Sequence, residues 1–238
     1  IKEAEEVGEV AIDTETSSLD PHQADLIGVS LSSKVGKACY IPIGHNSKKC
    51  INKDVVLNKL KPLLEDSSIK KIGQNIKFDF IVLFKHGITI SSIEDTMLMS
   101  YVLDAGKNRH NMDTLSEIHL DHKTIKFKEL VGSGKKEITF GEVDIDKAKD
   151  YAAEDADITF RLYKKFIKNL KLEKMINIYE IFEKPLIKIL ASMEMEGIEV
   201  DSKFLKSLSL KFEKKKNNLE KKVFKILKKE FNIVSPIQ

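Results

Sequence analysis

Short apolar runs punctuated by turn residues fill the first half of the chain, and an apolar repeat of helical period dominates the second half. Compact apolar runs predict strands, whereas apolar residues three and four apart predict helices. Strands are predicted at residues 7–15, 26–31, 38–43, 69–75 and 88–90. Helices are predicted at residues 53–64, 78–84, 95–103, 113–120 and 144–170. Because strands alternate with helices, the body is assigned to the α/β class with a mixed sheet, and its first three strands to an antiparallel meander.

The pattern becomes wholly helical after Asn177. Pro185 starts or kinks one helix, Gly197 ends it, and Asp201 caps another that is predicted to run to about residue 231. This change predicts two domains, residues 1–190 and 191–238. The Lys- and Gly-rich stretch 121–143 is predicted to be a mobile connection.

Composition and charge narrow the choice of partners. The 238 residues are 42% hydrophobic and 32% charged, which is typical of a globular protein. No apolar run approaches the ~20 residues of a membrane span, so no membrane partner is expected. Without a starting Met, the chain is expected to be a fragment of a longer one. Residues 203–229 contain eleven Lys and two Glu, a net +9 that leaves −6 on the remainder of the +3 chain. Such a split is compatible with a metal site in the body and a polyanion contact in the tail.

Asp13 and Glu15 end the first predicted strand. Residues two apart in a strand point to the same face, so the two carboxylates project together. Adjacent like charges raise each other's pKa, and a hard divalent cation such as Mg²⁺ or Mn²⁺ relieves the repulsion. Taken alone, the Asp-x-Glu tripeptide has a plainer interpretation as a solvated acidic turn.

Two further motifs carry carboxylates. Asp79 lies in the first turn of a predicted helix, where the helix dipole favours an anion. Tyr151 and Asp155 are four residues apart on the long helix and therefore share a face. Each has a plainer alternative, an ordinary helix-start acid in the first case and a solvated Tyr-Asp pair in the second.

In this order, the motifs Asp13-x-Glu15, Asn75-x-x-x-Asp79 and Tyr151-x-x-x-Asp155 resemble the three exonuclease motifs of the DEDD superfamily, tyrosine subtype. The flanking residues resemble the 3′-5′ exonuclease (proofreading) domain of bacterial family A DNA polymerases, the polymerase I or Klenow-fragment type. They comprise 12–20, 73–75, 109–113 and 151–157. The resemblance is strong over residues 7–175 and continues through 195–201. It implies a ribonuclease H-like mixed sheet flanked by helices, with a helical extension that begins the polymerase domain at the base of the thumb.

Hydrolysis of a phosphodiester needs a nucleophilic hydroxide near neutral pH and stabilisation of the leaving oxygen, and two divalent ions about 4 Å apart supply both. We expect Asp13 to bridge two Mg²⁺ ions, with Mn²⁺ or Zn²⁺ as alternatives. Glu15 and Asp155 would complete the ion that generates the nucleophile, and Asp79 would hold the second ion, in part through water. Tyr151, with an ordinary pKa of about 10, is expected to orient the attacking water.

The resemblance also implies contacts with a single-stranded DNA 3′ end. The residues implied are Thr16, Leu19, Gln74, Asn75, Phe78, Arg109 and Phe127. Leu19 would wedge against the bases, and Arg109 would contact a phosphate. Phe127 would stack on a base or else lie in the core. Phe78 stands where many relatives have Tyr. The other acids of the long helix, Asp150, Glu154 and Asp157, are expected to lie outside the site.

The predicted function is metal-dependent hydrolysis of DNA 3′ ends to nucleoside 5′-monophosphates, as the proofreading part of a polymerase active in DNA replication and repair. The resemblance implies a polymerase domain in cis, a monomer, and a bacterial cytoplasmic location at the nucleoid. Without palm and fingers, the fragment is not expected to synthesise DNA. The alternatives are an exoribonuclease of the DEDD type and a catalytically silent module that binds DNA or braces the polymerase. The presence of all four carboxylates argues against the silent module.

Overall fold

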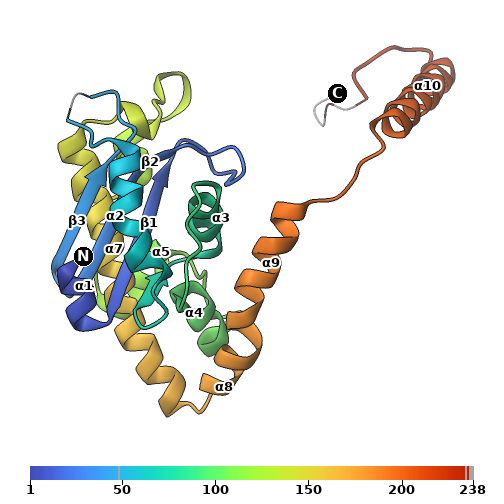
Figure 1. Ribbon diagram of the computed structural model, residues 1–238. Helices are drawn as coiled ribbons and strands as arrows, with labels where there is room; N and C mark the ends of the chain where they lie inside the picture. The colour runs from blue at the N-terminus through green and yellow to red at the C-terminus, as the bar shows by residue number, and fades with distance from the viewer. Residues whose placement is uncertain (48, 234, 236–238) are drawn as a thin grey trace. The chain divides into compact units, whose positions relative to one another are not determined.

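The computed structural model describes residues 1–47, 49–233 and 235 (Figure 1). The chain divides into two compact units, Ile1–Glu196 and Gly197–Gln238. The first unit extends beyond the boundary predicted near residue 190, because Ala191 is fully buried in its core. Within the described residues, every helix is too short or too polar to cross a membrane.

A five-stranded sheet of order β3-β2-β1-β4-β5 forms the centre of the first unit. Its strands are β1 (Glu9–Thr16), β2 (Leu26–Lys34), β3 (Lys37–Pro42), β4 (Lys70–Gly73) and β5 (Ile93–Asp95). The first three pair antiparallel, whereas β1 with β4 and β4 with β5 pair parallel. The predicted α/β class, mixed sheet and antiparallel meander are therefore confirmed.

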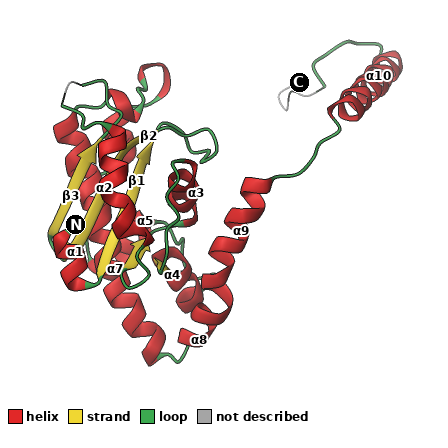
Figure 2. Ribbon diagram, viewed as in Figure 1, coloured by secondary structure: helices red, strands yellow, loops and turns green. Residues whose placement is uncertain are grey.

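Helices cover both faces of the sheet (Figure 2). Val10 and Ile12 of β1 pack in one core with α2 (Lys53–Glu65), α3 (Lys77–Lys85) and α9 (Lys184–Glu196). Ala11 packs in the other core, which has a different set of helices, α4 (Thr96–Asp104), α5 (Met112–Leu120) and α7 (Ile145–Leu172). Successive strand residues point to opposite faces, so β1 supplies side chains to both cores.

Several elements differ from the sequence-based prediction. Residues 88–90 do not form a strand; Ile88 and Ile90 are buried in a connection, and β5 follows at Ile93–Asp95. A helix, α1 (Lys2–Val7), precedes β1 and is ended by Gly8, which has a left-handed φ of 74°. The first strand therefore begins at Glu9, two residues later than predicted. The stretch 121–143 contains α6 (Phe127–Val131) and two short 3₁₀ helices, Gly134–Lys136 and Phe140–Glu142.

The helical end of the chain begins within the first unit. There α8 (Ile176–Ile178) leads into a π-helical turn, Tyr179–Glu183, and then into α9. In the second unit, α10 (Ser202–Leu227) starts at Asp201, whose side chain accepts the Phe204 N–H as predicted. This helix stops earlier than expected, because Lys228 adopts a left-handed conformation with φ of 53°.

Candidate active site and metal centre

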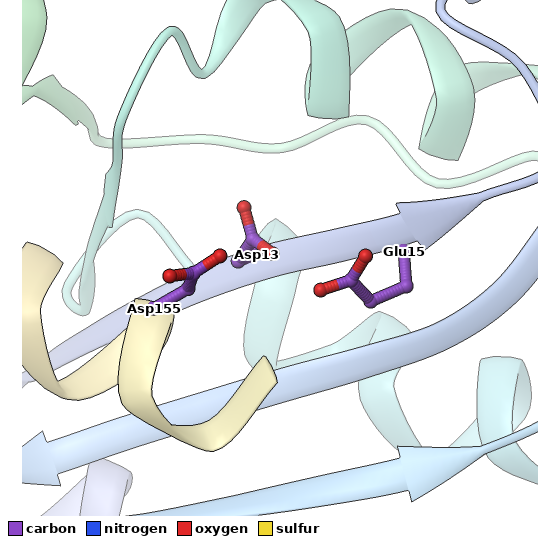
Figure 3. Close-up of side chains that lie close together, drawn as sticks. All are labelled: Asp13, Glu15 and Asp155. Carbon is purple, nitrogen blue, oxygen red and sulfur yellow. The ribbon is translucent and has the colours of Figure 1, made fainter. Parts of the chain in front are cut away.

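Three carboxylates converge beside the central strand (Figure 3). Asp13 and Glu15 extend from one side of β1, as their spacing predicts, and Asp155 extends from α7. One oxygen from each residue can be chosen so that all three lie within 4.8 Å of one another. This all-oxygen set has the size and chemistry that a hard divalent cation prefers.

Small residues bring α7 close enough to the sheet for this meeting. Ala148, Ala152 and Ala156 recur every fourth residue and are fully buried. Asp144 starts the helix by accepting the N–H of Asp146. These alanines let this part of α7 approach the sheet, so Asp155, next to Ala156, lies close to β1.

Burial raises the pKa values of all three carboxylates, and repulsion adds to the rise for Glu15 and Asp155. Burial raises the pKa of Asp13 to about 6. Burial first, and then the charges of Asp13 and Asp155, raise the pKa of Glu15 well above its usual range. Burial and the Asp13 charge likewise raise the pKa of Asp155, and a hydrogen bond from Tyr151 partly offsets the rise. Repulsion of this kind is relieved when a cation is bound between the carboxylates.

The Glu15 carboxylate carries the clearest sign of a missing partner. Glu15 is only 7% exposed, and its Oε1 is buried without a hydrogen-bond partner among the described residues. A buried polar atom left in this way is costly unless a ligand satisfies it. The residues present therefore fit a divalent cation held by Asp13, Glu15 and Asp155.

Asp79 reaches this region from the opposite side of β1. The side chain of Thr14, between Asp13 and Glu15, points the other way and donates a hydroxyl hydrogen bond to Asp79 Oδ1. The Thr14 N–H donates to the same oxygen at 2.9 Å. Burial, and then the charge of Asp13, raise the pKa of Asp79. Asp79 is thus electrostatically coupled to the cluster, but the three oxygens within 4.8 Å of one another do not include one of its own.

Tyr151 lies one helical turn before Asp155. Burial, followed by the charges of Asp155 and Glu15, raises the pKa of its phenol, so the hydroxyl is neutral at physiological pH. The ring packs edge-on against Phe127 and at a tilt against Phe140, with centroid separations of 6.0 Å in both pairs. This aromatic packing fixes the ring and leaves the neutral hydroxyl beside the carboxylates.

Four of the predicted DNA contacts have exposed side chains, Leu19, Asn75, Arg109 and Phe127. Leu19, in the loop after β1, is 96% exposed, and Arg109 is also exposed. Phe127 is 45% exposed and stacks on Phe140 with an interplanar angle of 9°. Since Phe127 also touches Tyr151, part of its ring packs against the protein and part is exposed, and stacking on a base stays a prediction.

Gln74 and Phe78 are instead held by contacts within the protein, on either side of the exposed Asn75. Gln74 uses both ends of its amide, donating to the His110 carbonyl at 2.8 Å and accepting from the Thr96 hydroxyl. Asn75 adopts a left-handed conformation with φ of 61° and exposes its side chain. Phe78 is half-buried against the core.

Thr16 is also tied internally, because its hydroxyl donates to the Ser18 carbonyl at 2.9 Å. The other acids of α7 have partners elsewhere. Glu154 accepts the Ile125 N–H at 2.7 Å, and Asp157 accepts the Gly36 N–H at 2.6 Å. Asp150 lies 3.3 Å from the Lys149 ammonium.

Sequence reasoning missed Tyr40, whose ring lies against Gly28, the sheet partner of Glu15. The Tyr40 hydroxyl lies 2.6 Å from His45 Nε2, and after burial the Glu15 charge contributes to raising the pKa of Tyr40. Gly28 pairs with Glu15 in the sheet and makes room for this ring, since a Cβ there would lie 2.1 Å from the Tyr40 hydroxyl oxygen. A glycine inside a strand was the available signal of such a close approach.

The raised pKa values predict a pH-dependent stability. Asp13 has a folded pKa of about 6 against an ordinary 3.8, so between these values the folded chain binds more protons than the unfolded chain. Stability from this site is fully present below pH 4 and is lost as the pH rises through 6. In chelator, Tm is expected to fall by about 5 °C between pH 5 and pH 8. Mg²⁺ should restore most of this loss at pH 8 and change little at pH 5, as thermal unfolding would measure. A Tm at pH 8 that ignores Mg²⁺ would contradict the assignment.

Comparison with known proteins relates these residues to a family. A family model described as 3′-5′ exonuclease matches residues 1–171. DNA polymerase I of Rhizobium leguminosarum is 42% identical over 100% of this chain and 25% of its own length. DNA polymerase I of Pseudomonas aeruginosa is 39% identical over 100% of this chain and 27% of its own length. The chain therefore spans about a quarter of these relatives.

Solved structures agree with the family. The apo form of a nuclease superposes with a TM-score of 0.65 at 25% identity, covering 84% of this chain and 93% of that one. Brucella melitensis NrnC with bound Mg²⁺ superposes with a TM-score of 0.62 at 27% identity, covering 84% and 92%. These nucleases confirm the predicted ribonuclease H-like fold class. The POL domain of Pol1 from M. smegmatis, at 20% identity and a TM-score of 0.72 over 96% of this chain and 35% of that one, supports the fold alone. The chain therefore belongs to the 3′-5′ exonuclease family of bacterial DNA polymerase I.

Proposed function

We propose that this chain hydrolyses DNA 3′ ends to nucleoside 5′-monophosphates, as the proofreading domain of a DNA polymerase I that acts in replication and repair. The observation that carries the proposal is the convergence of Asp13, Glu15 and Asp155 around the unpartnered Glu15 Oε1. Family membership supports the 3′-5′ direction. The relatives named DNA polymerase I support DNA as the substrate.

Two divalent ions complete the proposed site. Asp13, Glu15 and Asp155 would hold one ion, and Asp13 with Asp79 the other. An all-carboxylate set favours Mg²⁺ or Mn²⁺ over Zn²⁺, which is commonly bound by nitrogen and sulfur ligands. A solved relative, NrnC, is described with bound Mg²⁺. When bound, such ions lower the pKa of water and stabilise charge on the leaving oxygen.

The chain's own residues position the reactants. The neutral Tyr151 hydroxyl would form one hydrogen bond with the attacking water, as donor or acceptor. This bond would hold the water in line with the terminal phosphodiester. Thr14 donates two hydrogen bonds to Asp79 and so holds its carboxylate against β1. Phe127 would stack under a base, and the exposed Leu19 would wedge beside the terminal nucleotide.

The remaining substrate contacts are assigned by role. Thr16, Gln74, Asn75 and Phe78 would line the groove for the strand end, and Arg109 would contact a phosphate. Gln74 would act chiefly through the groove shape, since its amide is bonded within the protein.

Partners and context are inferred from the relatives. A polymerase domain would continue from residues 191–238 in cis, with the Lys-rich α10 as the base of the thumb against duplex phosphates. The protein would act as a monomer in the bacterial cytoplasm, at the nucleoid.

A timed digestion tests the proposal. Single-stranded DNA and RNA of the same base sequence, each labelled at the 5′ end, are incubated with Mg²⁺, Mn²⁺ or chelator. The proposal expects a ladder of DNA products shortened one nucleotide at a time from the 3′ end, with either metal and not with chelator. A second reaction with a 3′ label should release labelled 5′-monophosphate. Digestion of RNA alone would favour the exoribonuclease, and DNA binding without digestion would favour a silent module.

A further inference from the structure

Asp95, a buried carboxylate outside the metal cluster, accepts hydrogen bonds from the turn that precedes α3. Asp95, at the end of β5, is almost fully buried and accepts four backbone N–H groups. The donors are Met97 (2.8 Å), Ile76 (2.9 Å), Asn75 (3.2 Å) and Leu98 (3.3 Å). One side chain therefore caps α4 and holds the start of α3 at the same time.

The turn that Asp95 holds is conformationally demanding. Asn75 has a φ of 61°, a left-handed conformation that is uncommon outside glycine and that asparagine adopts more readily than most residues. Such a conformation persists only when its surroundings determine it. Asp79 follows one helical turn later and meets Thr14 of β1. The position of Asp79 thus depends on a turn that Asp95 fixes.

Asp95 is itself held from a distant part of the chain. Its backbone N–H donates to the Tyr179 hydroxyl oxygen at 2.9 Å, and that hydroxyl donates to Glu94 Oε2 at 3.0 Å. The Lys184 ammonium closes the network by donating to Glu94 Oε1 at 2.7 Å. Tyr179 is fully buried and lies in the π-helical turn before α9. Turns of this type often occur at functional sites.

Tyr179 and Lys184 lie beyond residues 1–171, the part of the chain that matches the exonuclease family. The network therefore joins the site to a segment outside that match. Burial raises the pKa of Asp95 to about 6, so near neutral pH its carboxylate is ionised and can accept all four N–H groups.

We propose that Asp95 and Tyr179 are positioning residues for the exonuclease site, which act through the Asn75 turn to place Asp79 for metal binding. The inference rests on the proposed function. It adds that the segment after residue 171 supports catalysis as well as linking the exonuclease fold to α10.

Tyr179→Phe tests the network, with Tyr163→Phe as the matched control. Both tyrosines are fully buried in the same core, and the Tyr163 hydroxyl is bonded only to the Lys70 ammonium, at 3.3 Å, among the described hydrogen bonds. Tyr179→Phe leaves the Asp95 N–H without its acceptor. It is expected to raise the Mg²⁺ concentration for half-maximal digestion about fivefold. The Mg²⁺-induced rise in Tm should be shifted to higher concentration by the same factor, whereas Tyr163→Phe should change neither midpoint.

Asp95→Asn provides a second variant of nearly equal size. Its amide nitrogen would face an N–H donor in either orientation, so a larger shift of about tenfold is expected. Unshifted Mg²⁺ midpoints in Tyr179→Phe, or equal shifts in Tyr163→Phe, would overturn the positioning role. The Tm measurement needs no digestion. If the unmodified protein binds Mg²⁺ but does not digest DNA, the proposed function is contradicted. The Mg²⁺ midpoints measured from Tm in the two variants still decide whether Asp95 and Tyr179 position the metal site.

Discussion

Asp13→Ala is expected to abolish metal-dependent digestion of DNA 3′ ends, with a fall on the order of a thousandfold or more. Asp13 is the carboxylate whose charge raises the pKa of each of the other three, Glu15, Asp79 and Asp155. It therefore occupies the position from which one side chain can serve both proposed ions. Its loss would remove a ligand from each at once.

Stability should change in the opposite direction from activity. Without a cation, Asp13 repels its neighbours inside the fold, so Asp13→Ala is expected to raise Tm in chelator by a few degrees. It should also remove most of the stabilisation that Mg²⁺ gives at pH 8. Gain of stability with loss of activity would separate a catalytic role from a structural one.

Asp150→Ala is the matched control for this variant. Asp150 is an exposed acid on α7 and pairs only with the surface Lys149 among the described ion pairs. Digestion rate and Tm of Asp150→Ala should equal those of the unmodified protein. Digestion by Asp13→Ala at the Asp150→Ala rate would refute the metal assignment.

The part of the site that the sequence predicts is the part with local periodicity. Asp13 and Glu15 share a face because a strand repeats every two residues, and Tyr151 and Asp155 share one because a helix nearly repeats every four. The cap at Asp201 was equally local, and its side chain accepts the Phe204 N–H. The central strand could be predicted from the sequence because its apolar run contributes side chains to both cores.

Features that depend on distant residues were not predictable in this way. The edge strand β5 has three residues and is defined by its parallel pairing with β4 rather than by its own composition. In the sequence, Thr14 is only the residue between two acids. In the structure its side chain points to the opposite face of the strand, where Thr14 donates two hydrogen bonds to Asp79. The bond between Tyr179 and Asp95 joins residues 84 apart, and no local pattern indicates it.

Tyr151→Phe is expected to slow hydrolysis about 10- to 100-fold at saturating Mg²⁺, while the Mg²⁺ midpoint shifts less than threefold. The phenylalanine ring keeps the packing against Phe127 and Phe140, so the fold and the carboxylate positions should survive. Only the hydroxyl that orients the attacking water is lost. Single-turnover digestion at several Mg²⁺ concentrations would separate the two effects.

The pH profile distinguishes orientation from proton abstraction by Tyr151. Burial and the neighbouring carboxylates raise the pKa of this phenol, so its deprotonation cannot produce a rise in rate near neutral pH. Tyr151→Phe should therefore lower the rate by the same factor across pH 6 to 9 and keep the shape of the profile. Tyr101→Phe, at an exposed tyrosine on α4, should leave rate and profile unchanged. If Tyr151→Phe flattened the alkaline rise, the phenol would be acting as a base. If it weakened Mg²⁺ binding as much as it slowed the reaction, the hydroxyl would be supporting the metal site instead of the water.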